Sequence, residues 1–199
     1  MRWWARARAL RLSPAVFVAV QLGAVLGTGL PDLPFPALLG GSSLGVPLTF
    51  VLALVPVWTL MHGRARVDAR QEAVAVRPVG HYDRLVQVVL VACAAAAAAV
   101  LHGAGAWQLA WAFPRDFAGY LGIAGLASAV TGARYAAVAP TLFMMLAATT
   151  GSAPDGRIHR WAWCLASPGD PLAAGVALAL FVAGLAGVGG LVFGRLRVG

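Results

Sequence analysis

Long uncharged runs dominate this chain of 199 residues. The last of them, Ala173–Phe193, is as long as the stretch of about 20 residues that a helix needs to cross a membrane. Only 11% of the residues are charged, whereas about a quarter are charged in a soluble domain. Because the runs are continuously apolar rather than alternating, we expect helices and not a barrel. The sequence therefore predicts an all-α integral membrane protein.

The apolar runs predict one transmembrane domain over residues 1–199, a polytopic bundle of six helices. The runs are Pro14–Leu30, Val46–Met61, Leu85–Leu101, Phe117–Val130, Tyr135–Thr150 and Ala173–Phe193. The fourth and fifth are short and are separated only by Thr131–Arg134. They are expected to form either a tight helical hairpin of two spans or a re-entrant pair.

Arginine placement predicts the orientation. All fifteen basic residues are arginines, and cytoplasmic segments of membrane proteins carry the basic excess. With both termini in the cytoplasm, only Arg115, Arg157 and Arg160 remain outside. Residues 1–13 then form a basic interfacial segment, and 102–116 and 151–171 form outer interfacial loops that contain tryptophans.

The same placement accounts for the net charge of +8 without a nucleic-acid partner. We expect a multi-pass protein of the plasma membrane, in contact with membrane lipids. The lysine-free composition, rich in alanine, arginine and glycine, is typical of a GC-rich bacterial genome.

Residues 64–84 form an unusually basic internal segment, expected as a cytoplasmic connection between the second and third spans. Arg66, Arg70 and Arg77 follow one helical stripe, so a short helix is predicted from Arg64 to Arg77. Pro78 is expected to end this helix. The helix either lies on anionic lipids or docks a cytosolic partner.

Two aspartates have expected roles around this segment. Asp68 is spaced to pair with Arg64 four residues earlier on the predicted helix. Asp83 is expected to cap the start of the third span, after a turn at Gly80.

The stretch EAVAVRPVGHYDRLVQVVL, residues 72–90, resembles the first intracellular segment of type-2 ABC exporter permeases. The matching positions are Glu72, Val74, Val76, Pro78, Val79 and Arg84. Leu165, Ser167 and Pro168 resemble the approach to the last span in that family. The sequence departs from the family pattern at Arg70-Gln71, where a Gly-Thr pair is usual.

The resemblance implies a coupling helix that is seated on a separate cytosolic ABC ATPase subunit. The residues expected to couple to that ATPase are Arg66, Arg70, Glu72, Val74, Arg77 and Pro78. ATP and Mg²⁺ would bind the partner, because this chain has no GxxxxGK[ST] motif. A second copy of the permease, or a related permease, would complete the transport pathway.

Other motifs give no indication of catalysis, so we expect no enzyme activity from the chain itself. HExxH and GxSxG are absent, and Cys93 and Cys164 do not belong to any metal-ligand cluster. Asp170 is expected to start the last helix. Gly190 and Gly194 have GxxxG spacing and are expected to allow close helix packing. The alternative to a permease is a non-transporting membrane scaffold or anchor subunit whose basic loop binds lipid or protein.

Overall fold

The computed structural model describes residues 12–26, 32–36, 44–66, 79–105, 109–153 and 155–195. For residues 12–14, 44, 79 and 188–195 it describes the backbone alone. In chain order, the described elements are α2 (Leu12–Leu26), β1 (Leu33–Phe35), β2 (Leu44–Val46), α3 (Leu48–Leu52), α4 (Leu54–Ala65), α6 (Val79–Gly103), α7 (Ala112–Thr131), α8 (Val138–Thr150), the 3-10 turn η2 (Trp163–Leu165) and α9 (Pro171–Arg195). The chain is mostly helical, which confirms the all-α class.

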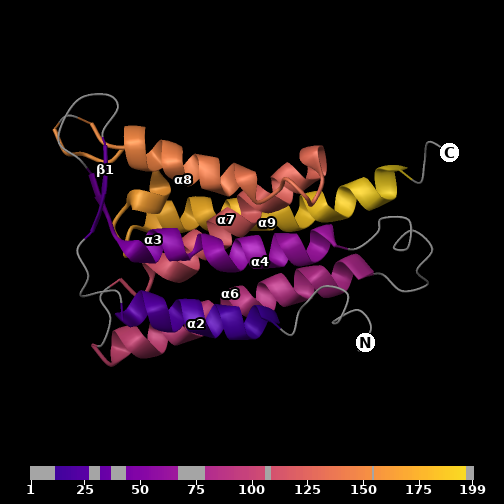
Figure 1. Cartoon of the computed structure of the whole chain (residues 1–199), viewed down its shortest axis with the longest axis horizontal. Helices are drawn as coiled ribbons and strands as arrows, with labels where there is room; N and C mark the ends of the chain where they lie inside the picture. Colours follow the sequence, from indigo (N-terminus) through magenta and orange to yellow (C-terminus); the bar gives the residue numbers. More distant parts are fainter. Residues whose placement is uncertain are drawn as a thin grey trace.

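The helices run back and forth along one axis (Figure 1). In the described part of the chain, α2, α3–α4, α6, α7, α8 and α9 make six successive passes, and each pass overlaps a predicted apolar run. We call the end where α4 finishes and α6 begins the arginine-rich end. The opposite end carries β1, β2 and η2 and is called the connector end (Figure 1).

The second pass is interrupted at Ala53, between α3 and α4. Pro56 lies in the first turn of α4 and has no N–H to donate to the carbonyl of Leu52, four residues earlier. The interruption is small, because Ala53 keeps right-handed helical angles (φ −61°, ψ −19°). The two helices therefore form one nearly continuous pass.

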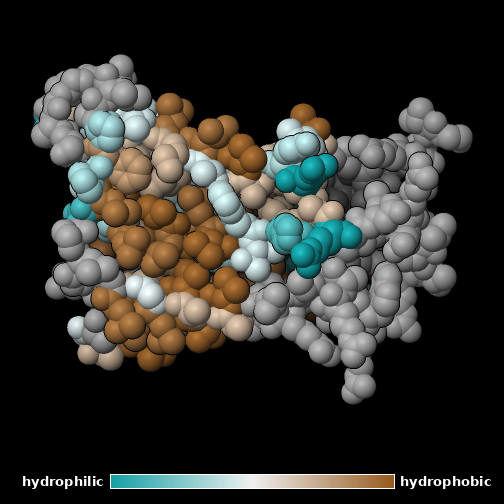
Figure 2. Space-filling model, viewed as in Figure 1, coloured by the Kyte–Doolittle hydropathy of each residue, from teal (hydrophilic) through white to brown (hydrophobic). Residues whose placement is uncertain are grey.

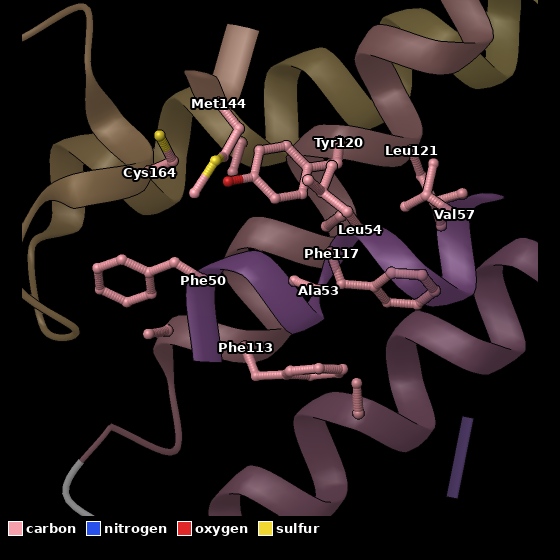
Figure 3. Close-up of a cluster of buried hydrophobic side chains, with 14 of the residues drawn as sticks. Phe50, Ala53, Leu54, Val57, Phe113, Phe117, Tyr120, Leu121, Met144 and Cys164 are labelled. Carbon is pink, nitrogen blue, oxygen red and sulfur yellow. The ribbon is translucent and has the colours of Figure 1, made fainter. Parts of the chain in front are cut away.

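Helix α7 lies at the centre of the bundle and has the most extensive packing, chiefly against α9. Every residue from Ala112 to Gly122 is buried. Its aromatic side chains pack against α2: the ring of Phe17 lies 5.7 Å from that of Phe117 and 6.3 Å from that of Phe113. Figure 3 shows Phe113, Phe117, Tyr120 and Leu121 of α7 close to residues of α3 and α4.

Glycines allow α7 and α9 to approach each other closely. A Cβ atom added to Gly184 of α9 would lie 2.6 Å from the carbonyl oxygen of Gly122 in α7. A Cβ atom on Gly125 would lie 2.9 Å from the backbone of Gly184. The two helix backbones are therefore in direct contact at these glycines.

The outer surface is strongly apolar (Figure 2). Two described segments, Leu48–Ala65 and Gly80–Gly103, are long and apolar enough to cross a membrane. Only 17% of the apolar window in Gly80–Gly103 is buried, unlike the core helix of a soluble protein. The buried residues of α6 form one narrow stripe, made of Asp83, Gln87, Ala94 and Ala98. An exposed apolar surface of this extent is typical of a surface that faces lipid or another protein.

Three boundaries differ from the sequence-based expectations. Helix α4 continues to Ala65, so Arg64 belongs to the second pass and not to a separate coupling helix. Helix α6 begins at Val79, so Gly80 is helical and the prediction that Asp83 caps this helix is wrong. Helix α7 begins at Ala112, which moves the end of the predicted outer loop 102–116 into a buried helix.

We predict that Gly184→Ala destabilises the protein while Gly175→Ala does not. An alanine at 184 would push its methyl group into the α7 backbone, at a cost of about 1–3 kcal/mol. A Cβ atom at Gly175, in the same helix, would meet nothing within 4 Å and would favour the helix slightly. Thermal unfolding in detergent, followed by size-exclusion chromatography, measures both variants. Equal melting temperatures for the two would contradict the close approach.

Candidate functional site

The residues predicted to couple to an ATPase lie mostly outside the described residues. Arg66 is exposed and follows the last residue of α4. The remaining five, Arg70, Glu72, Val74, Arg77 and Pro78, lie outside the described residues, as does Asp68. Gly190 and Gly194 belong to α9, but their surroundings are not described. Their predicted role in packing stays a prediction.

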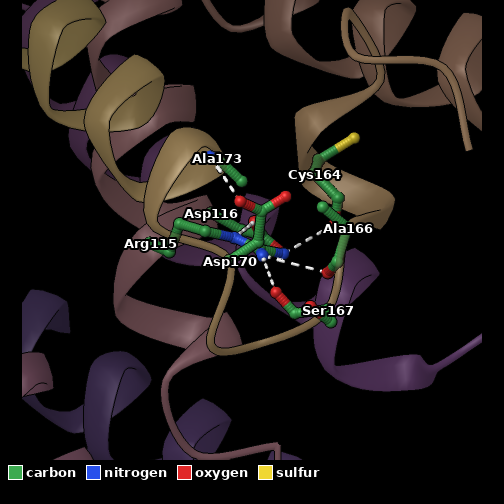
Figure 4. Close-up of polar contacts among 7 residues, drawn as sticks. All are labelled: Arg115, Asp116, Cys164, Ala166, Ser167, Asp170 and Ala173. Carbon is green, nitrogen blue, oxygen red and sulfur yellow. Dashed lines mark hydrogen bonds and ion pairs between the residues drawn. The ribbon is translucent and has the colours of Figure 1, made fainter.

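A buried arginine at the start of α7 organises the connector end. The Nη1 group of Arg115 donates hydrogen bonds to the carbonyl oxygens of Ala166 (3.0 Å) and Ser167 (2.8 Å). Its Nη2 group donates to the carbonyl of Cys164 at 2.9 Å (Figure 4). One side chain therefore satisfies three backbone acceptors that lie about fifty residues further along the chain.

Asp116 completes this group, which we call the Arg115 cluster: Arg115, Asp116 and the carbonyls of residues 164, 166 and 167. The Nε atom of Arg115 donates to Oδ1 of Asp116 at 2.9 Å, and the Asp116 side chain is fully buried. The second carboxylate oxygen of Asp116 has no hydrogen-bond partner. Because the pair is buried, removal of either partner would leave the other charge uncompensated in the interior, which is costly.

The expected outer loop at 151–171, which we call the connector, is packed in part: residues 162–165 are buried, whereas residues 155–161 are exposed. Trp163 is only 4% exposed, and its ring stacks on Phe143 with centroids 5.5 Å apart. Gly119 of α7 leaves the space that this indole fills. The interfacial position predicted for Trp163 is therefore wrong, because the side chain belongs to the core. Trp161 is 42% exposed and contacts Phe143 edge-on.

The connector ends in a helix cap that the sequence predicted. Oδ1 of Asp170 accepts a hydrogen bond from the backbone N–H of Leu172 at 2.9 Å, in the first turn of α9. Figure 4 shows Asp170 beside Arg115, with the connector between α7 and α9. The role of Asp170 as a helix start is confirmed.

The thiol of Cys164 lies within the connector. Burial raises the pKa of the Cys164 thiol to about 12, so this thiol is protonated at neutral pH and is a poor nucleophile. No group of three potential metal ligands occurs among the described residues. A half-open cavity of about 230 Å³ lies between Pro47 and Phe50 on one side and Leu165 and Pro168 on the other, with a mainly apolar lining. The Arg115 cluster holds the backbone of the connector against the start of α7 through these hydrogen bonds.

A second ion pair lies at the arginine-rich end. Nε of Arg64, in the last turn of α4, is 3.6 Å from Oδ2 of Asp83 in α6. The side chains are 16% and 7% exposed. Hydropathy reasoning assigned Asp83 to a helix cap and Arg64 to a pair with Asp68, so it missed this contact. The useful signal was a lone acid near the start of a long apolar helix, because such a charge requires a partner.

No protein-family model, no curated protein and no solved structure matches this chain.

We predict that Arg115→Lys is strongly destabilising. A lysine ammonium cannot reproduce the fork of donors that reaches Asp116 and three carbonyls, and unsatisfied buried groups cost about 3–5 kcal/mol in total. Arg157→Lys is the matched control, because its pair with Asp155 (3.3 Å) is 88% and 55% exposed and contributes little. Unfolding in detergent compares the two variants. A stable Arg115→Lys protein would show that the cluster does not hold the connector.

Proposed function

We propose that this chain is a membrane-spanning permease subunit of an ATP-driven ABC exporter in a bacterial plasma membrane. A separate cytosolic subunit would hydrolyse ATP, and a second copy of the chain or a related permease would complete the pathway. Two described helices are long and apolar enough to cross a membrane. The proposed permease has six such spans, with both ends of the chain in the cytoplasm.

The observation that carries the proposal is how charge is distributed over the antiparallel passes. Among the described arginines, Arg64, Arg66 and Arg84 lie at the arginine-rich end, and Arg134 lies in the turn between α7 and α8 at the same end (Figure 1). Figure 2 shows brown, apolar residues over most of the described part of the front face, with hydrophilic residues at its borders. This arrangement agrees with a bundle whose arginine-rich end faces the cytoplasm.

The sequence between α4 and α6 supports a coupling role for this end. Residues 67–78 contain Arg70, Glu72, Arg77 and Pro78, which resemble the exporter segment. They join the end of α4 to the start of α6 at the arginine-rich end. A cytosolic ATPase that bound this segment could therefore act on α4 and α6 at once. A basic loop that only binds lipid, in a scaffold protein, would need no such partner.

We predict that a P-loop ATPase co-purifies stoichiometrically with the chain in mild detergent. Glu72→Arg should lower its recovery by at least about tenfold, which is a loss of about 1.4 kcal/mol. Asp155→Arg, a charge reversal at an exposed residue of the connector end, serves as the control and should leave recovery unchanged. Quantitative mass spectrometry of the purified complex measures the ratio. A well-folded chain that carries no ATPase would favour the scaffold function.

We predict opposite sidedness for two single cysteines in a Cys93→Ala, Cys164→Ala background. Ala133→Cys lies in the turn between α7 and α8, at the arginine-rich end, and should react with a membrane-impermeant maleimide only after the cells are opened. Asp155→Cys at the connector end should react on intact cells. Labelling of both cysteines from the same side would contradict the six-span layout, because α8 would then not cross the membrane.

A further inference from the structure

The half-open cavity at the connector end lies between two segments that are far apart in the sequence. The apolar residues that line it are Pro47 and Phe50 from the start of the second pass and Ile158, Leu165, Ala166 and Pro168 from the connector. Its volume is about 230 Å³. An apolar cavity of about 150 Å³ already binds benzene, whereas drug-sized ligands occupy about 300 Å³ or more. The cavity therefore has room for part of one alkyl chain.

Arg115 holds both walls of this cavity in place. Its Nη1 group donates hydrogen bonds to the carbonyls of Ala166 and Ser167 in one wall (Figure 4). Its Cζ atom lies 5.9 Å from the centre of the Phe50 ring in the other wall. The cavity is thus formed before any ligand arrives, and a preformed site loses less entropy on binding.

Two exposed charges of opposite sign lie beside the cavity. A Cβ atom added to Gly45, which lines the cavity, would be 3.0 Å from Oδ2 of Asp32. On the connector side, Arg160 follows Ile158 by two residues, a distance of at most about 7 Å along the backbone. Neither charge has an ion pair within the part of the chain that the structure describes.

The other described charges near the cavity are already engaged. Arg157 pairs with Asp155 at 3.3 Å, and Asp170 accepts a hydrogen bond from the N–H of Leu172 at the start of α9. One carboxylate on the β1–β2 side and one guanidinium on the connector side therefore remain. This pattern is complementary to a head group that carries both an ammonium and a phosphate.

We propose that this cavity is a binding site for a zwitterionic phospholipid with a primary ammonium, of the phosphatidylethanolamine class. The upper part of one acyl chain would enter the cavity, Asp32 would bind the ammonium, and Arg160 would bind the phosphate. The apolar outer surface of α6 is suited to a membrane, where such lipids are abundant. The site goes beyond the proposed function, because it needs no ATPase and serves a permease or a scaffold equally.

Photo-crosslinking in vesicles tests the cavity. The probe is phosphatidylethanolamine with a diazirine near the carboxyl end of one acyl chain, diluted into phosphatidylglycerol vesicles that contain the protein. Mass spectrometry should locate the crosslink at the lining residues. Ala166→Leu fills the cavity and should lower this crosslink at least about fivefold, or about 1 kcal/mol. Ala129→Leu, at another partly buried alanine near the far end of α7, should leave it unchanged.

Variants at the rim test the head group. A phosphatidylglycerol probe with the same diazirine lacks the ammonium and should label the site less than the phosphatidylethanolamine probe. Asp32→Asn should remove this preference, whereas Asp155→Asn should keep it. Arg160→Gln should weaken labelling by both probes about threefold, the range of an exposed charge pair, and Arg134→Gln at the other end of the bundle should not.

Soluble phosphoethanolamine in excess separates a lipid site from a site for a free zwitterion. It should not compete with the probe, because it has no chain to fill the cavity. Competition by it, equal labelling by the two lipid probes, or full labelling of folded Ala166→Leu would each overturn the proposal. Asp32→Asn changes an exposed side chain, so it provides the test even where Ala166→Leu does not fold. A preference for phosphatidylethanolamine that survives in Asp32→Asn would also overturn it.

Discussion

The direct contact between the backbones of α7 and α9 is the constraint on which the arrangement of the other elements depends. Gly122, Gly125 and Gly184 allow this contact, because any side chain at these positions would enter the neighbouring backbone. With α9 so close, α7 is buried over its whole first half, and the other passes surround it. Close approach of two backbones gives extensive van der Waals contact, which stabilises helix pairs.

Once α7 is central, its first turns become the attachment point for a connector far along the chain. Arg115 and Asp116 enter the interior because the helix that carries them does, and the backbone carbonyls of the connector supply the acceptors that the guanidinium requires. Trp163 and Tyr120, with ring centroids 5.9 Å apart, pack beside this group. The connector end is therefore held by a set of directional bonds, and the start of α9 is fixed with it through Asp170.

Sequence reasoning succeeded where periodicity and composition determine the outcome. The apolar runs correctly predicted the helices, and the Asp170 cap was recognisable from local chemistry. It failed for Arg115, Asp116 and Asp83, since hydropathy places charged residues in loops and gives no information about partners that are distant in sequence. The predicted interfacial position of Trp163 was wrong for the same reason, because Gly119, which makes room for its ring, lies in another helix. The coupling residues from Arg70 to Pro78 stay predictions, because they lie outside the described residues.

The two ends of the bundle are held by different kinds of contact, and this difference bears on the proposed function. At the connector end, Arg115 bonds to several backbone groups at once, so movement there requires several hydrogen bonds to break together. At the arginine-rich end, the described contacts include the Arg64–Asp83 ion pair and the packing of α6 against α7 and α9. If the arginine-rich end faces the cytoplasm, as proposed, the Arg64–Asp83 pair lies on the side from which an ATPase would act.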